Sequence, residues 1–201
     1  MTVVITEGTA ERHLRAERAT LTFTPRVVAD TAAAAVAGVE STVTTLAARA
    51  RALRDSGDAT WHQVGTVRVH SRTVGQDDDR VEHIAQASVQ IKLANLDLVG
   101  PLTSEFSAAT VSVTPQWALT EQTRHAHERE VRIAAVAAAR ARAEDYAAAL
   151  QGTVREVLEV SDLAGPTASG VRGASASPAA AEVTVPEITV SGRVTARFDV
   201  R

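Results

Sequence analysis

The sequence predicts an α+β domain in which two long alanine-rich helices and one short helix pack on one face of an antiparallel β-sheet. Several segments alternate apolar and polar residues, which indicates strands with one wet face. Two longer segments carry apolar residues at steps of three and four, the pattern of a helix packed by one side. Aromatic residues make up only 3% of the chain, so alanine, valine, leucine and isoleucine must build the core.

Two strands are expected before the first helix. Residues 2–6 (TVVIT) are a β-branched run that Glu7 and Gly8 close. Residues 18–24 alternate apolar residues with threonine, and Pro25 ends this strand or places it at a sheet edge. The second strand therefore has one buried face and one face of threonines that water reaches.

The first long helix follows these strands. Asp30 is the expected N-cap, because its carboxylate can accept hydrogen bonds from the free amides of the first turn. The apolar stripe extends from Val36 to Leu53, and Ser56-Gly57-Asp58 ends the helix. A helix with a single stripe packs by one side on a flat surface.

A hairpin and a short helix make up the middle of the chain. Residues 61–74 and 81–93 are the expected strands of the hairpin, and GQDDD at residues 75–79 is its turn. Residues 95–108 indicate the short helix. A further strand is expected at residues 111–119, where apolar residues alternate again.

The longest helix begins near Thr120 or Glu121 and ends at Gly152. Its predicted apolar face consists of Ala135, Val136, Ala139, Ala143, Tyr146, Ala147 and Leu150. Alanines line most of this face, and small side chains allow a helix to lie close to a sheet. A strand at residues 153–160 follows directly.

The end of the chain combines a biased segment with a strand. Residues 165–182 are rich in glycine, alanine, serine and proline, which favours a flexible loop. Residues 194–200 alternate as the final strand. We therefore expect a single domain over residues 1–201, interrupted only by this loop.

Composition and charge exclude several classes of function. There are no cysteines, so thiolate metal sites, thiol nucleophiles and disulfides are excluded. The net charge is −3 and the isoelectric point about 6.1, unlike a typical nucleic-acid-binding domain. The hexapeptide AARARA occurs at residues 47–52 and 138–143, but arginines two apart splay across a helix instead of forming a basic stripe. The longest apolar helical run, residues 134–139, is too short to span a membrane.

The histidines are the residues most worth testing as a site. His125 and His127 are two apart on a helix, so they point in different directions and cannot share a metal. His62, His70 and His83 lie in the predicted hairpin, where two of them could meet across strands. These three are the alternative metal ligands, although exposed histidines on a polar face explain the pattern more simply.

No pattern in the chain predicts catalysis. No serine lies in a G-x-S-x-G sequence, which marks a nucleophile elbow. Asp77, Asp78 and Asp79 lack the continuation of a calcium loop. GVRG at residues 170–173 is not followed by a helix that could bind phosphate. We therefore expect no enzyme, no cofactor and no resident metal.

A set of short motifs, made mostly of small and aliphatic residues, extends along the whole chain. Residues 3–10 read V-x-I-T-x-G-x-A, and a strand ATLTFTP follows at residues 19–25. The long helix carries A-x-x-x-A-R-A-R-A-x-x-Y-A-x-x-L-x-G at residues 135–152, and a strand V-x-x-V-x-E-V follows. VSVTPQWALT at 111–120 and PEITVSGRVTARFDV at 186–200 complete the pattern. Over residues 3–200 the chain resembles the SIMPL domain family.

This resemblance implies a fold and a broad role. Family members are mostly of unknown biochemical activity; several are exported to the periplasm or cell surface, and some assemble into large ring- or channel-like oligomers. The animal namesake is a kinase-binding partner in signalling. No catalytic residue is established for the family, so the resemblance assigns none here.

The combined expectation is a non-enzymatic interaction or assembly protein of bacterial type that forms a homo-oligomer. The alternative is a small-ligand or metal-binding protein that uses His62, His70 and His83. The chain as written has no leader peptide, so we expect a cytoplasmic protein, or an exported one if a leader precedes residue 1. Nucleic acid is not expected as a partner.

Overall fold

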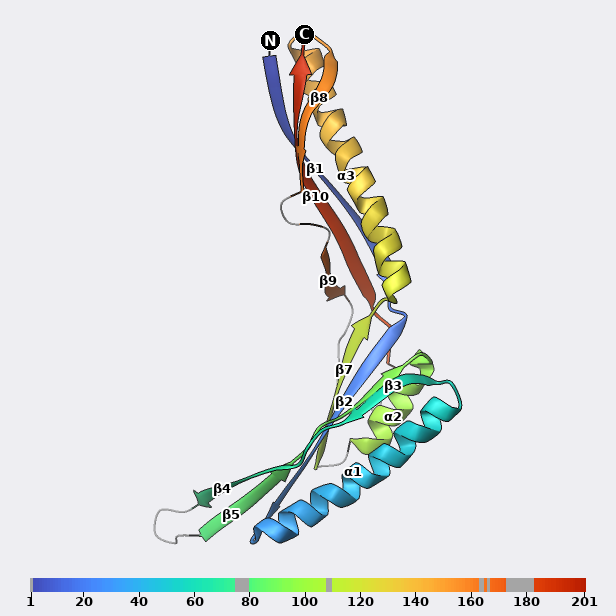
Figure 1. Cartoon of the computed structure of the whole chain (residues 1–201), viewed down its shortest axis with the longest axis vertical. Coiled ribbons are helices and arrows are strands. Elements are labelled where there is room, and N and C mark those ends of the chain that lie inside the picture. Colours follow the sequence, from blue (N-terminus) through green and yellow to red (C-terminus); the bar gives the residue numbers. More distant parts are fainter. Residues whose placement is uncertain (1, 75–79, 108–109, 163–164, 166, 173–182) are drawn as a thin grey trace. The chain divides into compact units, whose positions relative to one another are not determined.

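The mixed helices and antiparallel strands of the chain confirm the predicted α+β class (Figure 1). The computed structural model describes residues 2–74, 80–107, 110–162, 165, 167–172 and 183–201, with the backbone alone described at Arg80 and at residues 167–172. The chain divides into two compact units. Unit 1 contains the described residues within 1–16, 119–174 and 185–201, and unit 2 contains those within 17–118 and 175–184. The single domain over residues 1–201 remains a prediction.

Unit 1 is built on a long two-stranded ribbon. Strand β1 (Thr2–Arg15) pairs antiparallel with β10 (Glu187–Val200) along its whole length. The other edge of β10 pairs with β8 (Val154–Ser161) and β9 (Thr167–Arg172). Helix α3 (Glu121–Ala149) packs on β1 and β10.

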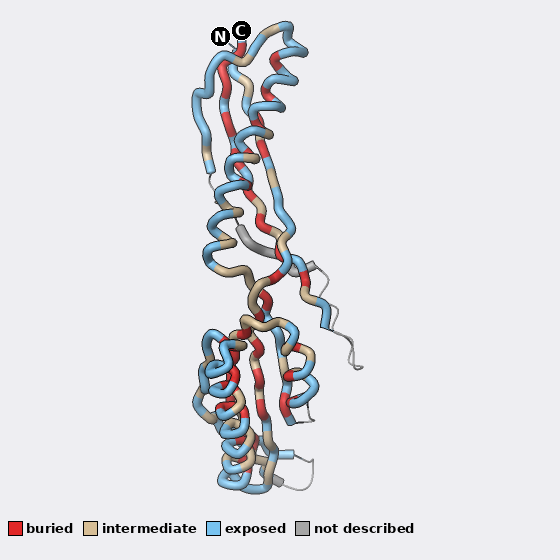
Figure 2. Tube along the Cα trace, turned by 90° about the vertical axis from the view of Figure 1, so that its right-hand side faces the viewer, coloured by how far each residue is buried: buried red, intermediate tan, exposed pale blue. Residues whose placement is uncertain are grey.

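The packing of α3 confirms the alanines of the predicted apolar face, but Val136, Tyr146 and Leu150, which were predicted on that face, are exposed. The buried residues of this helix recur at steps of four and are Val131, Ala135, Ala139, Ala143 and Ala147. They pack on alternate residues of β10, including Phe198, and Figure 2 shows the buried positions running along the strands and one side of the helices. Thr120 caps the helix by accepting a hydrogen bond from the Thr123 backbone amide, as its predicted start requires.

Three expectations for unit 1 are wrong in detail. Strand β1 continues through Gly8 to Arg15, because the missing side chain of Gly8 makes room for α3 and does not end the strand. Residues 167–172, expected within a loop, form β9 by pairing with β10. Helix α3 ends at Ala149 and not at Gly152; Gln151 takes the left-handed conformation, with a φ of 59°.

Unit 2 is built on a wider antiparallel sheet. Among the described residues its strand order is β3-β6-β2-β5-β4, and β7 also pairs with β2. The strands are β2 (Arg18–Ala29), β3 (Ala59–Val64), β4 (Arg68–Val74), β5 (Arg80–Gln86), β6 (Val89–Leu93) and β7 (Val111–Ala118). The predicted hairpin therefore consists of two pairings, β4 with β5 and β3 with β6.

The helices of unit 2 cover one face of this sheet. They are α1 (Ala32–Asp55), the 3-10 turn η1 (Leu96–Leu98) and α2 (Val99–Phe106). The core-facing side of β2 carries Leu21 and Phe23, and the Phe23 ring meets that of Phe106 edge-on at 5.4 Å. The described strands thus form two sheets and not the single sheet predicted, with α3 on one sheet and α1 and α2 on the other.

Two local expectations for unit 2 are wrong. Thr31, not Asp30, is the N-cap of α1, because the Thr31 hydroxyl accepts a hydrogen bond from the Ala34 amide. Strand β2 continues through Pro25 to Ala29. Proline is tolerated there because β2 pairs with β6 up to Phe23 and with β5 only from Arg26 onward, so no ladder donor is needed between these pairings.

Candidate functional site

The three hairpin histidines do not converge. His70 lies on β4 opposite Ile84, and His83 lies on β5 opposite Ser71. Directly opposite residues share a face and consecutive residues alternate, so His70 and His83 point to opposite faces of the sheet. His62 lies on β3, which pairs with β6. Within the described part of the chain no three histidine, aspartate or glutamate side chains form a group that could hold a metal ion.

The other patterns singled out in the sequence are accounted for or lie outside the described structure. Arg49 approaches Glu105, with 3.6 Å between Nε and the carboxylate, and Arg140 pairs with Glu144 at 2.9 Å. These arginines therefore form ordinary ion pairs on helix surfaces. Asp77, Asp78 and Asp79 lie outside the described residues, as does Gly173 of the GVRG sequence.

The first surface of interest is the free edge of β1. This strand is 14 residues long, and among the described strands only β10 pairs with it. Its register with β10 is continuous, whereas the register of β8 with β10 shifts twice. Proteins usually protect exposed strand edges by making them short, bulged or charged. Residues 2–6 of β1 contain no charge and no proline, so this part of the edge lacks the usual protection, whereas residues 7–15 carry several charges.

Apolar side chains flank this edge on the face turned away from α3. Thr6 and Gly8 of β1 contact α3, so the odd-numbered residues of the strand lie on the other face. Val3 and Ile5 are therefore on that outer face, and the exposed fraction of Ile5 is 61%.

Apolar side chains also flank the edge on the helix side. Arg142 of α3 donates a hydrogen bond of 2.6 Å to the Glu7 backbone carbonyl, so this row of the helix lies over β1. Tyr146 and Leu150 follow Arg142 at steps of four and share its side of the helix. The exposed fraction of Leu150 is 60%. We call residues 2–6 together with Tyr146 and Leu150 the β1 edge patch.

The second surface of interest is the face of the unit 2 sheet turned away from α1 and α2. On β2 the residues facing the helices are buried, and Thr20, Thr22 and Thr24 alternate with them. Cross-strand register places Lys92 beside Thr20 and Gln90 beside Thr22. We call this side of the sheet the polar face. It continues onto the neighbouring strands with Trp61, Gln63, Arg68, Gln86, Thr114 and Gln116.

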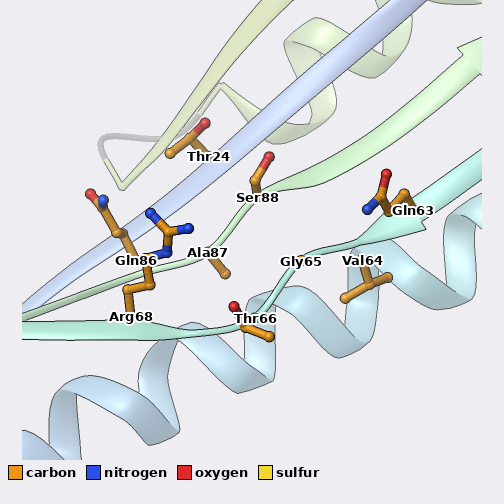
Figure 3. A pocket seen from close by; sticks show the side chains of 9 residues that line it. All are labelled: Thr24, Gln63, Val64, Gly65, Thr66, Arg68, Gln86, Ala87 and Ser88. Carbon is orange, nitrogen blue, oxygen red and sulfur yellow. The ribbon is translucent and has the colours of Figure 1, made fainter.

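Two hollows lie on the polar face. One has a volume of about 540 Å³ and is lined by Thr20, Thr60, Trp61, Gln90, Lys92 and Gln116. The other has a volume of about 480 Å³ and includes Thr24, Gln63, Arg68, Gln86 and Ser88. Figure 3 shows the Thr24, Gln63, Gln86 and Ser88 side chains directed away from α1, with Arg68 reaching toward Gln86. Hydroxyls, amides and cations thus line both hollows.

Two titratable groups whose pKa values are shifted, Asp58 and Arg124, take part in contacts at helix ends. Hydrogen bonds from Ser56 and Asn95 lower the pKa of Asp58, and these bonds fix the end of α1 to the segment after β6. A hydrogen bond and ion pair with Glu121 raise the pKa of Arg124 in the first turn of α3. Both are ordinary stabilising contacts at helix ends.

Comparison with known proteins gives a family match. The sequence model of the SIMPL family, described as a protein of unknown function (DUF541), matches residues 4–198 of the chain. No curated protein matches it. In the described residues, no helix combines the length and the apolar character needed to cross a membrane.

Proposed function

The chain belongs to the SIMPL family, and we propose that it is a non-enzymatic protein that assembles with copies of itself through the β1 edge patch. The observation that carries this proposal is the uncharged edge of residues 2–6, which no strand in the described part of the chain covers and which has exposed apolar side chains on both sides. Unpaired strand edges associate readily, because the backbone of a second strand satisfies their amides and carbonyls.

The sequence of this segment suits pairing with itself. If two copies pair antiparallel about Val4, Val3 of each copy lies opposite Ile5 of the other, and Thr2 lies opposite Thr6. Val3 and Ile5 of both copies then share one face and cover one another. No charged side chain lies in the paired segment, so no like charges oppose each other.

Two substitutions test the assembly. Ile5→Lys places a charge on one side of the edge, and Leu150→Lys places one on the other side. We expect each variant to raise the dissociation constant of self-association at least tenfold in analytical ultracentrifugation, because a lysine ammonium resists burial. Ile133→Lys is the matched control, because Ile133 lies on α3 with an exposed fraction of 62% and outside the β1 edge patch.

A wild-type protein that stays monomeric at millimolar concentration contradicts the proposal. So does an assembly that Ile133→Lys weakens as much as Ile5→Lys does. Circular dichroism spectra should coincide for all variants, since each replaces an exposed side chain.

The alternative predicted from the sequence, metal binding by His62, His70 and His83, has no comparable geometric support. Metal analysis of protein purified without an affinity tag, and thermal shifts with divalent ions, test it directly.

A further inference from the structure

The polar face of unit 2 has a composition that suits a polyhydroxylated ligand. Its central rows are made of threonine hydroxyls and glutamine amides, with Trp61, Lys92, Thr20 and Gln116 in one row and Gln63, Gln90, Thr22 and Thr114 in the next. The Gln90 amide lies 3.5 Å from the Thr22 hydroxyl, the long limit of a hydrogen bond. Hydroxyls and amides each donate and accept hydrogen bonds, and so do the hydroxyls of sugars.

The charges on this face are predominantly positive. Lys92 lies in the first row, and Arg26 and Arg68 flank Gln86 at the other end of the sheet. In the described residues these three cations form no ion pair, whereas Arg72, farther along β4, pairs with Glu82 at 2.8 Å. A positive face on a chain of net charge −3 favours a ligand that carries negative charge.

Trp61 provides an apolar platform at the edge of the face. Its exposed fraction is 42%, although tryptophan usually contributes its large ring to a core. The other tryptophan, Trp117, is buried on the helix side of the sheet. An exposed indole beside Lys92 and Gln90 can cover the C–H face of a sugar ring, while the polar neighbours bind its hydroxyls.

The two hollows follow one another along the strands. Lys92 lines the first and Gln86 the second, and this separation along an extended chain corresponds to about 20 Å. A linear ligand several rings long could therefore contact both hollows. An extended site favours a polymer over a small metabolite.

We propose that the polar face binds a segment of an acidic polysaccharide. Trp61 stacks on one sugar ring, the threonines and glutamines exchange hydrogen bonds with ring hydroxyls, and Lys92, Arg26 and Arg68 pair with carboxylates. A guanidinium binds a carboxylate through two parallel hydrogen bonds, so Arg26 and Arg68 make their end of the polar face selective for acid groups.

Nucleic acid fits this face less well. Binding of single strands generally uses several aromatic platforms and a continuous basic groove, but this face has a single exposed tryptophan and its two central rows carry one charged side chain, Lys92. Phosphate oxygens only accept hydrogen bonds, so they would leave the acceptor atoms of the glutamines and threonines without partners.

Titration calorimetry with defined polymers tests the proposal on the full chain. The probes are an oligogalacturonate, a neutral gluco-oligosaccharide of the same length and an oligodeoxythymidylate. We expect the oligogalacturonate to bind best, with an affinity that falls as salt is added. Arg68→Gln should weaken binding about tenfold, the size of one lost charge-assisted contact. Trp61→Ala should weaken it by a similar factor, because the ring that stacks on the sugar is lost. Arg51→Gln, on the exposed side of α1, should leave the affinity unchanged.

The proposal is overturned if the oligogalacturonate does not bind, if the neutral sugar binds equally well, or if the oligodeoxythymidylate binds more tightly. An equal loss of affinity in Arg51→Gln and Arg68→Gln also overturns it, because the binding would then be unspecific charge attraction. Assembly through the β1 edge patch is measured separately, so either proposal can fail alone.

Discussion

In each unit a long helix packs on a β-sheet, but the side chains at the two helix–sheet interfaces differ in size. In unit 1 the buried stripe of α3 is made almost entirely of alanines, and it lies against Gly8 of β1. In unit 2 the buried stripe of α1 includes Val39, Leu46 and Leu53. Phe23 and Phe106 add two large aromatic rings to that core. Unit 1 therefore depends on close approach of backbones, and unit 2 on the volume of its side chains.

This difference explains which surfaces stay open. One helix on a narrow ribbon covers β1 and β10 from one side and leaves the strand edge exposed. The helices of unit 2 pack on one face of a wider sheet, although the residues of β4 are exposed, and leave the polar face open. The proposed surfaces follow from these two designs: an edge suits pairing with another strand, and a broad polar face suits an extended ligand.

We expect the largest loss of stability in unit 2, whose core depends on the volume of its side chains. Phe23→Ala removes a fully buried ring that packs edge-on against Phe106. We expect a loss of about 4 kcal/mol in the free energy of unfolding, because a cavity remains in a core of large side chains. Urea unfolding followed by near-ultraviolet circular dichroism measures it. A loss below 1 kcal/mol would mean that unit 2 does not depend on volume in the way proposed.

The close approach in unit 1 is tested by adding one methyl group. A Cβ on Gly8 would lie 1.9 Å from the Ala135 carbonyl oxygen and 2.5 Å from the Ala139 nitrogen. These are backbone atoms of a helix, so α3 must move away from β1. We expect Gly8→Ala to cost about 3 kcal/mol of unfolding free energy in urea titrations.

Gly38 in α1 is the matched control for Gly8. A Cβ there would lie 3.1 Å from a methyl carbon of Val27, which can shift slightly because it ends a side chain. Alanine also favours the helix over glycine by about 1 kcal/mol. Gly38→Ala should therefore be neutral or stabilising. If Gly38→Ala lowered the free energy of unfolding strongly and Gly8→Ala did not, the close approach of backbones would belong to unit 2 and not to unit 1.

Much of the fold could be predicted because it depends on local periodicity. The predicted faces of residues 18–24 and of α1 pack on the core, and so do the alanines predicted for α3, although Tyr146 and Leu150 at the end of that face are exposed. The continuation of β1 past Gly8 could not be predicted, because that glycine reads as a strand end until α3 is placed against it. Strand β9 was missed because its pairing with β10 is a tertiary interaction that composition does not reveal.

The candidate surfaces were less predictable than the fold. The wet threonine face of residues 18–24 is visible in the sequence, but its continuation across the sheet depends on strand order. The divergence of His70 and His83 depends on strand register, and a slip of one residue would place both histidines on the same face.

The cytoplasmic location remains a prediction that cell fractionation can check. An acidic polysaccharide ligand would favour an exported protein, because such polymers are largely extracellular.

A smaller effect is expected from the hydrogen bond that joins β1 to α3. The buried Thr6 hydroxyl donates to the Ala139 carbonyl at 2.6 Å. Thr6→Val keeps the volume and removes the donor, so we expect a loss of about 1 kcal/mol in urea unfolding. Thr22→Val, on the polar face of unit 2, is the comparison. Its contact with Gln90 is long and partly exposed, so its effect should stay within about 0.5 kcal/mol. Equal effects at both threonines would contradict the idea that unit 1 depends on close approach.

The smallest expected effect is a dependence of the stability of unit 2 on pH. Hydrogen bonds from Ser56 and Asn95 lower the pKa of Asp58 below its ordinary value of 3.8. The folded state thus favours the carboxylate, and its stabilising contribution is present above pH 3.8 and is lost as pH falls through the lowered pKa. We expect Asp58→Asn to lower the melting temperature at pH 7, with a difference from wild type that narrows below pH 4. A difference that widened on acidification would show that the carboxylate opposes folding. Because unit 1 has no part in these contacts, the melting of Thr6→Val should keep the same offset from wild type across this pH range.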